Sequence, residues 1–310
     1  MSTAVFTHPA CLEHDTGPGH PERRQRLEAV LMALAEPEFA ALDRREAPRA
    51  ELDQIVRVHD RAFVESLLAR MPQRGWAALD GDTTMSPGSG EAALRAVGAM
   101  VAAIDLVMSA GATNAFCAVR PPGHHAESDM AMGFCLFNNV AIGAAHACAV
   151  HGAKRVAIVD FDVHHGNGTQ HIFEHDARVL YASTHQMPLY PGTGARSEHG
   201  IGNVCNAPLP AYSGGEAFRD AYEEIVLPAI DRFAPDLLLI SAGFDAHRAD
   251  PLASLELEAE DFGWVTERLA QLAATHCRGR LVSTLEGGYD LAALAESTAA
   301  HVAALMAAKA

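Results

Sequence analysis

The sequence predicts a single α/β domain built on a mainly parallel β-sheet. Short apolar or β-branched runs alternate with long segments rich in alanine and leucine, and these runs are almost continuously apolar, as strands covered on both faces are. No linker, repeat or low-complexity segment divides the 310 residues, 49% of which are hydrophobic. We therefore predict one domain over residues 1–310.

Six strands and six helices are expected from the alternation. The strands are predicted at residues 3–8, 114–120, 155–163, 179–185, 236–244 and 279–286. The helices are predicted at residues 21–35, 89–110, 138–151, 214–233, 258–276 and 291–308.

Composition excludes some classes of function. The formal net charge is −16, so neither nucleic acid nor an anionic membrane is an expected partner. Six scattered cysteines without a CxxC pair are typical of reduced thiols in a cytoplasmic protein, and the N-terminus does not read as a signal peptide. We expect a cytoplasmic protein, and its oligomeric state is left open.

Four of the predicted strands run directly into unusual polar segments. RPPGHHAE follows the second strand, DFDVHHGN ends the third, SAGFDAH ends the fifth and LEGGYD ends the sixth. In open parallel sheets, ligands bind beyond the carboxyl ends of the strands. The four segments are therefore predicted to form one site.

The segment DFDVHHGN has the features of a metal site. Asp162 and His164 are two residues apart, so in an extended chain their side chains point to the same side. Asp245 in SAGFDAH is the best-placed third ligand, and three such ligands leave room for water, as in catalytic zinc sites. Asp160 is a candidate for a carboxylate that supports a neighbouring site residue, or for a ligand of another cation. The alternative is a polar strand end with a capping aspartate and a structural histidine.

The remaining two segments suggest acid–base and oxyanion chemistry. His124 and His125 follow two prolines and a glycine, and two imidazoles beside an activated water can act as general base and general acid. A carboxylate would keep one of them charged, whereas an amide such as Asn167 would orient the other. Tyr289 could donate its hydroxyl to a developing oxyanion. The alternatives are a surface turn for the histidines and a turn before a helix for the tyrosine.

Seven motifs in order carry a family resemblance: GHPE, RPPGHHA, GFCLFNN, DFDVHHGNGTQ, YPGTG, SAGFDAHRADP and LEGGY. Together they resemble the zinc-dependent histone deacetylase superfamily, most closely its class II and bacterial histone deacetylase-like amidohydrolases. The resemblance implies the three-layer arginase/deacetylase fold, with a mainly parallel sheet of about eight strands between helices.

The resemblance also implies roles for individual residues. The implied zinc ligands are Asp162, His164 and Asp245; the implied catalytic residues are His124, His125, Tyr289, Asp160 and Asn167. Asp160 and Ser183 match a structural potassium site. Residues of the acyl-lysine tunnel are implied at Gly133, Phe134, Tyr190 and Leu252.

The sequence departs from its relatives at some of these positions. Tyr190 stands where many relatives have phenylalanine, so the tunnel should gain a hydroxyl. HPERR at residues 20–24 replaces the commoner HPERP. The segment SPGS at residues 86–89 does not align with the class II serine that contacts substrate, so no residue is assigned there.

The expected activity is removal of acetyl or another short acyl group from acyl-lysine in a peptide or protein, or from a related small amine. Acetylpolyamine deacetylation is the main alternative; Leu252 stands where some polyamine enzymes have a glutamate, which favours acyl-lysine. A non-catalytic binding protein and an arginase-like two-manganese hydrolase are remote alternatives. The Asp₂His set also accepts Fe²⁺ or Co²⁺, so the metal used in the cell stays open.

Overall fold

The computed structural model describes residues 2–308, so residues 1, 309 and 310 of the predicted domain lie outside the described part. A parallel sheet of eight strands forms its centre, in the order β2-β1-β5-β10-β9-β6-β7-β8. In chain order these strands are β1 (Thr3–Thr7), β2 (Asp43–Glu46), β5 (Asn114–Cys117), β6 (Val156–Asp160), β7 (Val179–Gln186), β8 (Val204–Leu209), β9 (Leu237–Ala242) and β10 (Leu281–Leu285). The predicted fold class is therefore confirmed.

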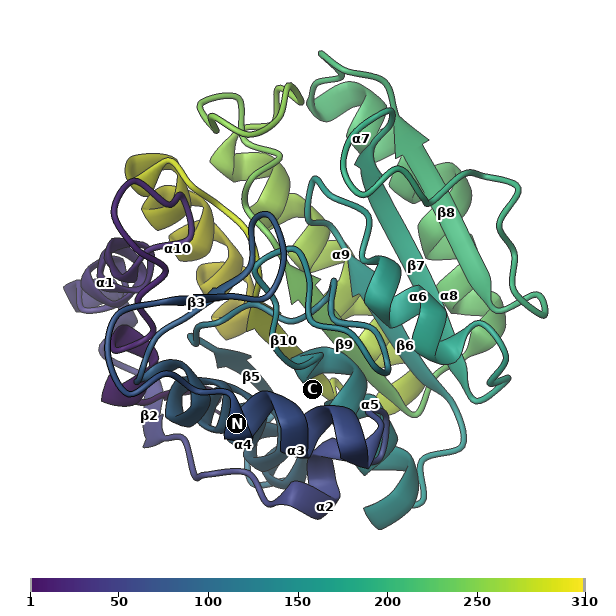
Figure 1. Cartoon of the computed structure of the whole chain (residues 1–310). Helices are drawn as coiled ribbons and strands as arrows, with labels where there is room; N and C mark the ends of the chain where they lie inside the picture. The colour runs from purple at the N-terminus through teal and green to yellow at the C-terminus, as the bar shows by residue number, and fades with distance from the viewer. Residues whose placement is uncertain (1, 309–310) are drawn as a thin grey trace.

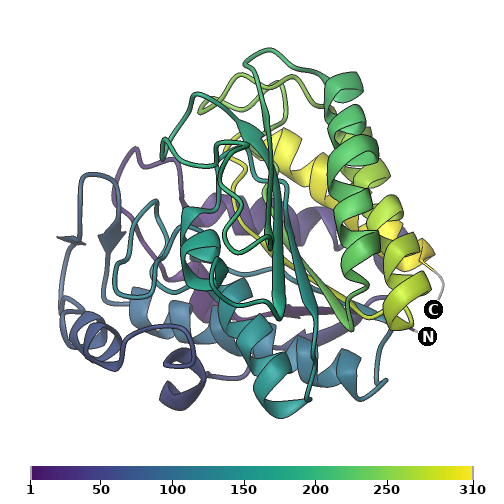
Figure 2. The same cartoon turned by 90° about the vertical axis from the view of Figure 1, so that its right-hand side faces the viewer.

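Helices cover both faces of this sheet, which makes three layers (Figures 1 and 2). One layer contains α1 (Arg24–Ala33), α8 (Leu227–Phe233), α9 (Ala259–Cys277) and α10 (Leu291–Ala307), and the other contains α4 (Ser89–Met108), α5 (Asn139–Val150) and α6 (Asn167–Phe173). Further elements are α2 (Leu52–Ile55), α3 (Arg61–Ala69), α7 (Gly215–Ala221) and the hairpin of β3 (Ala77–Ala78) with β4 (Thr84–Met85). Within residues 2–308, no helix combines the length and apolarity that crossing a bilayer requires.

All six strands expected from apolar runs are present, whereas the two edge strands were not expected. β2 has the sequence DRRE, and β8 contains Pro208. An edge strand pairs on one side only and tolerates charge or proline, so it lacks the apolar run that marks a buried strand. The predicted helix at residues 214–233 is α7 and α8 joined by a π-helical turn at Tyr222–Val226.

The sheet order places the four predicted site segments side by side. β5, β10, β9 and β6 are consecutive neighbours at its centre and are labelled in this order from left to right in Figure 1. Every residue of these strands is buried, so they belong to the core of the sheet. Their carboxyl ends are level, with Asp160 paired to Ser241 and Ala242 to Leu285. The four loops therefore leave the same edge of the sheet.

Candidate active site

The loops at this edge enclose a cavity of about 230 Å³. Eight of the residues predicted from the sequence line it: His124, His125, Gly133, Phe134, His164, Tyr190, Leu252 and Tyr289. Pro122 and Gly287, which belong to the predicted segments RPPGHHAE and LEGGYD, also line it, together with Asp82 and Leu189, which the sequence did not indicate. The structure thus brings together segments that are up to about 200 residues apart in the chain.

Asp162, His164 and Asp245 converge as predicted. Nδ1 of His164 lies 3.2 Å from Oδ1 of Asp162 and 3.1 Å from Oδ2 of Asp245. Ligands about 2.0–2.1 Å from a tetrahedral zinc ion are separated from each other by about 3.3 Å, so these distances fit that geometry. Backbone N–H groups orient the carboxylates, because Val163 donates to Asp245 and Gly287 donates to Asp162.

The electrostatics of this triad favour a cation. Burial alone would lower the pKa of His164, but hydrogen bonds to the Asp162 and Asp245 carboxylates outweigh it and raise that pKa to about 10. The triad therefore stabilises positive charge at a buried position. One imidazole and two carboxylates are also a donor set that zinc accepts. Both the spacing and the chemistry of these three residues fit the implied metal.

A second group of potential ligands has different distances. Between α4 and the end of α5, Nε2 of His146 and Nε2 of His151 each lie 2.7 Å from Oδ1 of Asp105. This separation is that of a hydrogen bond and is about 0.6 Å shorter than the spacing between ligands of tetrahedral zinc. We therefore interpret this group as two histidines that donate to one carboxylate.

The tandem histidines are buried and have different partners. Nδ1 of His124 lies 3.0 Å from Oδ2 of Asp160, and Nδ1 of His125 lies 2.8 Å from Oδ1 of Asn167. Burial alone would lower the pKa of His124, but Asp160 and then Asp162 outweigh it, so that pKa is raised well above its usual value. Burial and the nearby charges of His124 and His164 lower the pKa of His125 well below its usual value. At neutral pH the pair is one imidazolium and one neutral imidazole.

Tyr289 follows β10 and its side chain is buried. Its ring contacts that of Phe134, with centroids 5.9 Å apart, and the Arg26 guanidinium lies 4.8 Å from its centroid. Arg26 also donates to the backbone carbonyl groups of Glu286 and Gly288. Burial raises the pKa of Tyr289 well above its usual value, although Arg26 opposes this, so the phenol keeps its proton and can donate it in a hydrogen bond.

Comparison with known proteins identifies the family to which this arrangement belongs. A sequence model of the histone deacetylase domain matches residues 20–305. The chain belongs to the histone deacetylase family. It is 40% identical to a probable deacetylase of Archaeoglobus fulgidus, over 94% of this chain and 82% of that protein. It is 39% identical to a histone deacetylase-like amidohydrolase of Pseudomonas aeruginosa, over 93% of this chain and 82% of that protein.

A solved structure supports the same assignment. The HD domain of HDA15 superimposes with a TM-score of 0.92 at 36% sequence identity, covering 99% of this chain and 88% of that one. A likeness over nearly the whole chain includes the sheet as well as the site loops. The arginase/deacetylase fold that the motifs implied is therefore confirmed.

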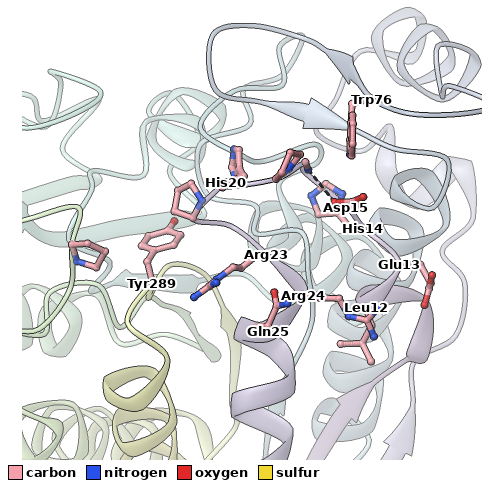
Figure 3. Close-up of a pocket in the computed structure, with 15 residues that line it drawn as sticks. Leu12, Glu13, His14, Asp15, His20, Arg23, Arg24, Gln25, Trp76 and Tyr289 are labelled. Carbon is pink, nitrogen blue, oxygen red and sulfur yellow. Dashed lines mark hydrogen bonds between the residues drawn. The ribbon is translucent and has the colours of Figure 1, made fainter.

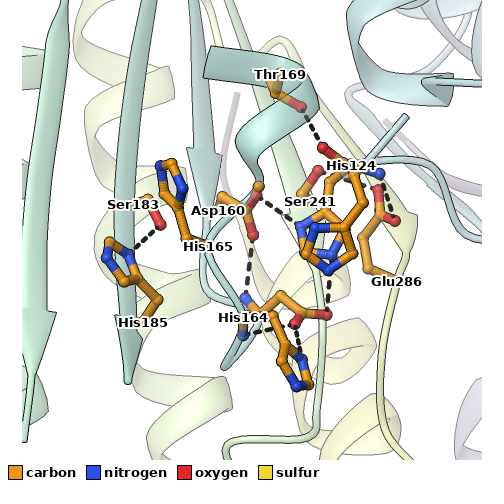
Figure 4. A network of polar contacts seen from close by, with 12 residues as sticks. His124, Asp160, His164, His165, Thr169, Ser183, His185, Ser241 and Glu286 are labelled. Atoms are coloured by element: carbon orange, nitrogen blue, oxygen red, sulfur yellow. Dashed lines mark hydrogen bonds and ion pairs between the residues drawn. The ribbon is translucent and has the colours of Figure 1, made fainter. Parts of the chain in front are cut away.

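Glu286, in the LEGGYD motif, was not expected to take part in the histone deacetylase site. Its carboxylate is fully buried, and Oε2 accepts the N–H groups of Gly123 at 2.6 Å and His124 at 3.1 Å (Figure 4). Oε1 accepts the hydroxyl of Ser241. Glu286 thereby ties the tandem-histidine loop to β9 and β10. An acidic residue between a buried strand and a glycine pair was the sequence signal that could have revealed it.

The cavity wall depends on a tight turn at Gly133 and Phe134. Gly133 has φ +57°, and a Cβ atom there would collide with the ring of His125, so the turn requires glycine. The Phe134 N–H donates to the hydroxyl of Thr83. Tyr190 lies against His125 with ring centroids 5.1 Å apart. The predicted wall residues therefore border the tandem histidines directly.

The residues implied as a potassium site lie on the neighbouring strands β6 and β7. Asp160 and Ser183 are paired in the sheet register, and Oδ2 of Asp160 accepts the hydroxyl of Tyr181 at 3.1 Å. The Ser183 hydroxyl lies 2.9 Å from Nδ1 of His185 (Figure 4). The binding of potassium by these residues stays a prediction.

Proposed function

We propose that this histone deacetylase family member hydrolyses the amide of an acetylated or short-chain acylated amine. One observation carries the proposal: a metal-type triad, an imidazolium, a neutral imidazole and a protonated phenol converge in one cavity. An amide hydrolase needs an activated water, a proton acceptor and a donor for the carbonyl oxygen. The cavity supplies a separate group for each role.

Zinc held by Asp162, His164 and Asp245 would polarise the amide carbonyl and lower the pKa of water. Nδ1–H of His125 donates to Asn167, which leaves Nε2 free to accept a proton from the attacking water. The protonated His125 would then give this proton to the leaving amine. His124, held charged by Asp160, supplies positive charge, and the Tyr289 hydroxyl donates to the oxygen that becomes negative.

The surroundings of the cavity support an acyl-lysine in a peptide as the substrate. A cleft of about 740 Å³ shares Tyr289 with the cavity, and Arg23, Arg24 and the half-exposed Trp76 also line it (Figure 3). The cavity has room for the acylated lysine side chain, and the cleft has room for the peptide that carries this side chain. Leu252 at the cavity wall carries no charge that could bind the second, cationic amine of a polyamine substrate.

One observation favours the alternative, an acetylated polyamine. Asp82 lines the cavity, and its backbone carbonyl accepts a hydrogen bond from Nε2 of His20, which holds the turn in place. Burial and the neighbouring Asp80 raise the pKa of its carboxyl group. Within residues 2–308, no arginine or lysine forms an ion pair with Asp82. A cationic amine would relieve this uncompensated charge.

A side-by-side assay tests both proposals. Zinc-loaded protein would be given an acetyl-lysine peptide, acetylputrescine and acetylspermidine, with Tyr289→Phe as the comparison. We expect faster turnover of the peptide and a roughly 100- to 1000-fold lower rate for Tyr289→Phe. Faster turnover of the polyamines would favour the Asp82 alternative. Binding without turnover, unchanged by Tyr289→Phe, would instead indicate a non-catalytic binding protein.

A further inference from the structure

Asp250 lies outside the cavity but is hydrogen-bonded to two residues that line it. It belongs to the loop between β9 and α9, and only 7% of its surface is exposed. Oδ2 accepts the backbone N–H of Tyr289 at 2.7 Å, and Oδ1 accepts the backbone N–H of Leu252 at 3.0 Å. The Asp250 carboxylate therefore links the loop that carries Tyr289 to the loop that carries Leu252.

The hydrogen bond to Tyr289 completes a set of restraints on the glycine-containing segment that carries the phenol. Gly287 and Gly288 precede Tyr289, and Gly288 adopts φ +121°, which glycine alone tolerates well. Arg26 holds the carbonyl groups of Glu286 and Gly288. Asp250 holds the next N–H group along the chain. Without this acceptor, the Gly288–Tyr289 peptide group, which sets the direction of the phenol, would be held only at its carbonyl oxygen by Arg26.

A carboxylate at this depth is costly unless its hydrogen bonds compensate. Burial, followed by the charge of Asp245, raises the pKa of Asp250 to about 7, while the N–H groups of Leu252 and Tyr289 lower it. An apolar side chain would avoid the desolvation penalty, but it would leave both N–H groups without their acceptor. The carboxylate is thus needed for its two partners.

We propose that Asp250 is a positioning residue that couples the direction of the Tyr289 hydroxyl to the position of the Leu252 wall. The proposal rests on the proposed amidohydrolase function for its kinetic consequences only. Because both partners share one carboxylate, a displacement of the wall by a longer acyl chain is transmitted to the phenol. Rate and acyl-chain selectivity should therefore change together when Asp250 is altered.

The first test is a double-mutant cycle between Asp250→Asn and Tyr289→Phe. Asparagine keeps one acceptor oxygen but turns an amide group toward the other N–H, so one of the two bonds is lost. We expect kcat on an acetyl substrate to fall roughly 10- to 100-fold with KM within about threefold, because small misplacements of catalytic groups carry that cost. In the Tyr289→Phe background, Asp250→Asn should change kcat by less than about twofold. If the kcat of the double variant fell by the product of the two single-variant losses, the two residues would act independently and the proposal would be overturned.

The neighbouring Asp290 offers a matched control. It caps α10 by accepting the N–H groups of Ala292 and Ala293, and asparagine is an equally good cap. Asp290→Asn should therefore leave kcat within about twofold of the wild type. The ratio of acetyl to butyryl turnover should change in Asp250→Asn and stay constant in Asp290→Asn. A constant ratio in both variants would contradict the coupling to Leu252.

Amide hydrogen exchange separates this proposal from the proposed function. In Asp250→Asn, the N–H group that loses its acceptor, that of Tyr289 or that of Leu252, should exchange at least about tenfold faster than in the wild type, whereas neither group should do so in Asp290→Asn. This readout needs no turnover, so an inactive wild type would overturn the proposed function and leave the exchange result decisive. Unchanged exchange would overturn the positioning role. If Asp250→Asn does not fold, Asp250→Glu, which displaces both oxygens by one methylene group, replaces it in every measurement.

Discussion

Nδ1 of His125 lies 2.8 Å from the amide oxygen of Asn167. A neutral amide orients an imidazole but stabilises its positive charge less than a carboxylate does, and this distinguishes His125 from His124, which faces Asp160. The orientation of Asn167 is itself fixed, because its Nδ2 donates to Glu127 at 2.8 Å. The orientation of the His125 imidazole therefore depends on a chain of two contacts, whereas its low pKa comes from burial and the charges of His124 and His164.

Replacing Asn167 by aspartate should move the pH profile of the enzyme. An aspartate alone would place two carboxylates in contact, so Asn167→Asp is combined with Glu127→Gln, and Glu127→Gln alone is the control. A carboxylate beside His125 should raise its pKa by roughly 1–3 units. Since the base must be neutral to accept a proton, the acidic limb of kcat/KM should shift to higher pH by that amount. An unshifted limb would argue against His125 as the base.

Gly287 should be essential for metal binding for steric reasons. A Cβ atom at this position would collide with Oδ2 of Asp245 and lie 2.6 Å from Oδ2 of Asp162. Gly287→Ala should lower zinc affinity about 10- to 100-fold, measured by competition with a chelator. Gly263→Ala is the control, because its Cβ atom would have no neighbour closer than 3.6 Å and alanine favours a helix. Equal zinc affinity in both variants would contradict the assigned metal site.

Trp76 and Asp82 should affect different substrates. Trp76→Ala removes an aromatic wall of the large cleft, so KM for an acetyl-lysine peptide should rise roughly tenfold while that for acetylputrescine stays constant. Asp82→Asn should instead raise KM for acetylputrescine. Tyr212→Ala changes an exposed aromatic residue outside both cavities and serves as control. If Trp76→Ala left the peptide KM unaltered, the cleft would have no part in substrate binding.

A buried histidine that does not line the cavity should make stability depend on pH. His301 is hydrogen-bonded to Thr266 and Ser283, and burial lowers its pKa to about 3. Between pH 6.5 and 3 the unfolded chain binds a proton that the folded chain excludes, so stability is lost as pH falls. From pH 7 to 5 this loss is about 2 kcal/mol for one such group.

The His301→Gln variant should therefore lose about 2 kcal/mol less than the wild type between pH 7 and 5. Urea unfolding at each pH measures the difference, and the shared effects of pH on other groups cancel between the two proteins. His199→Gln, at an exposed position, controls for the loss of one imidazole. Parallel pH dependences of His301→Gln and the wild type would contradict the assignment of His301 as a buried neutral group.

Residue patterns along the chain were enough to predict the strands and the polar segments that gather at their ends. Alternating apolar runs predicted the strands, because a buried strand must be apolar on both faces. The spacing of Asp162 and His164 predicted their convergence from an extended chain, in which residues i and i+2 share a side. The two residues do converge, but β6 ends at Asp160 and they lie in the bend that follows it. The polar segments after four strands were enough to predict one shared site, because parallel strands end at a common edge.

The residues that hold the site loops in place could not be predicted in the same way. Glu286, Arg26 and Asp250 act through hydrogen bonds to backbone groups of distant loops, and such partners leave no periodic pattern in the sequence. The sheet order also comes from packing: β5, β10, β9 and β6 are neighbours in space although β10 is the last strand in the chain. Local residue patterns are short-range, whereas these contacts arise from how helices and strands fit around one core.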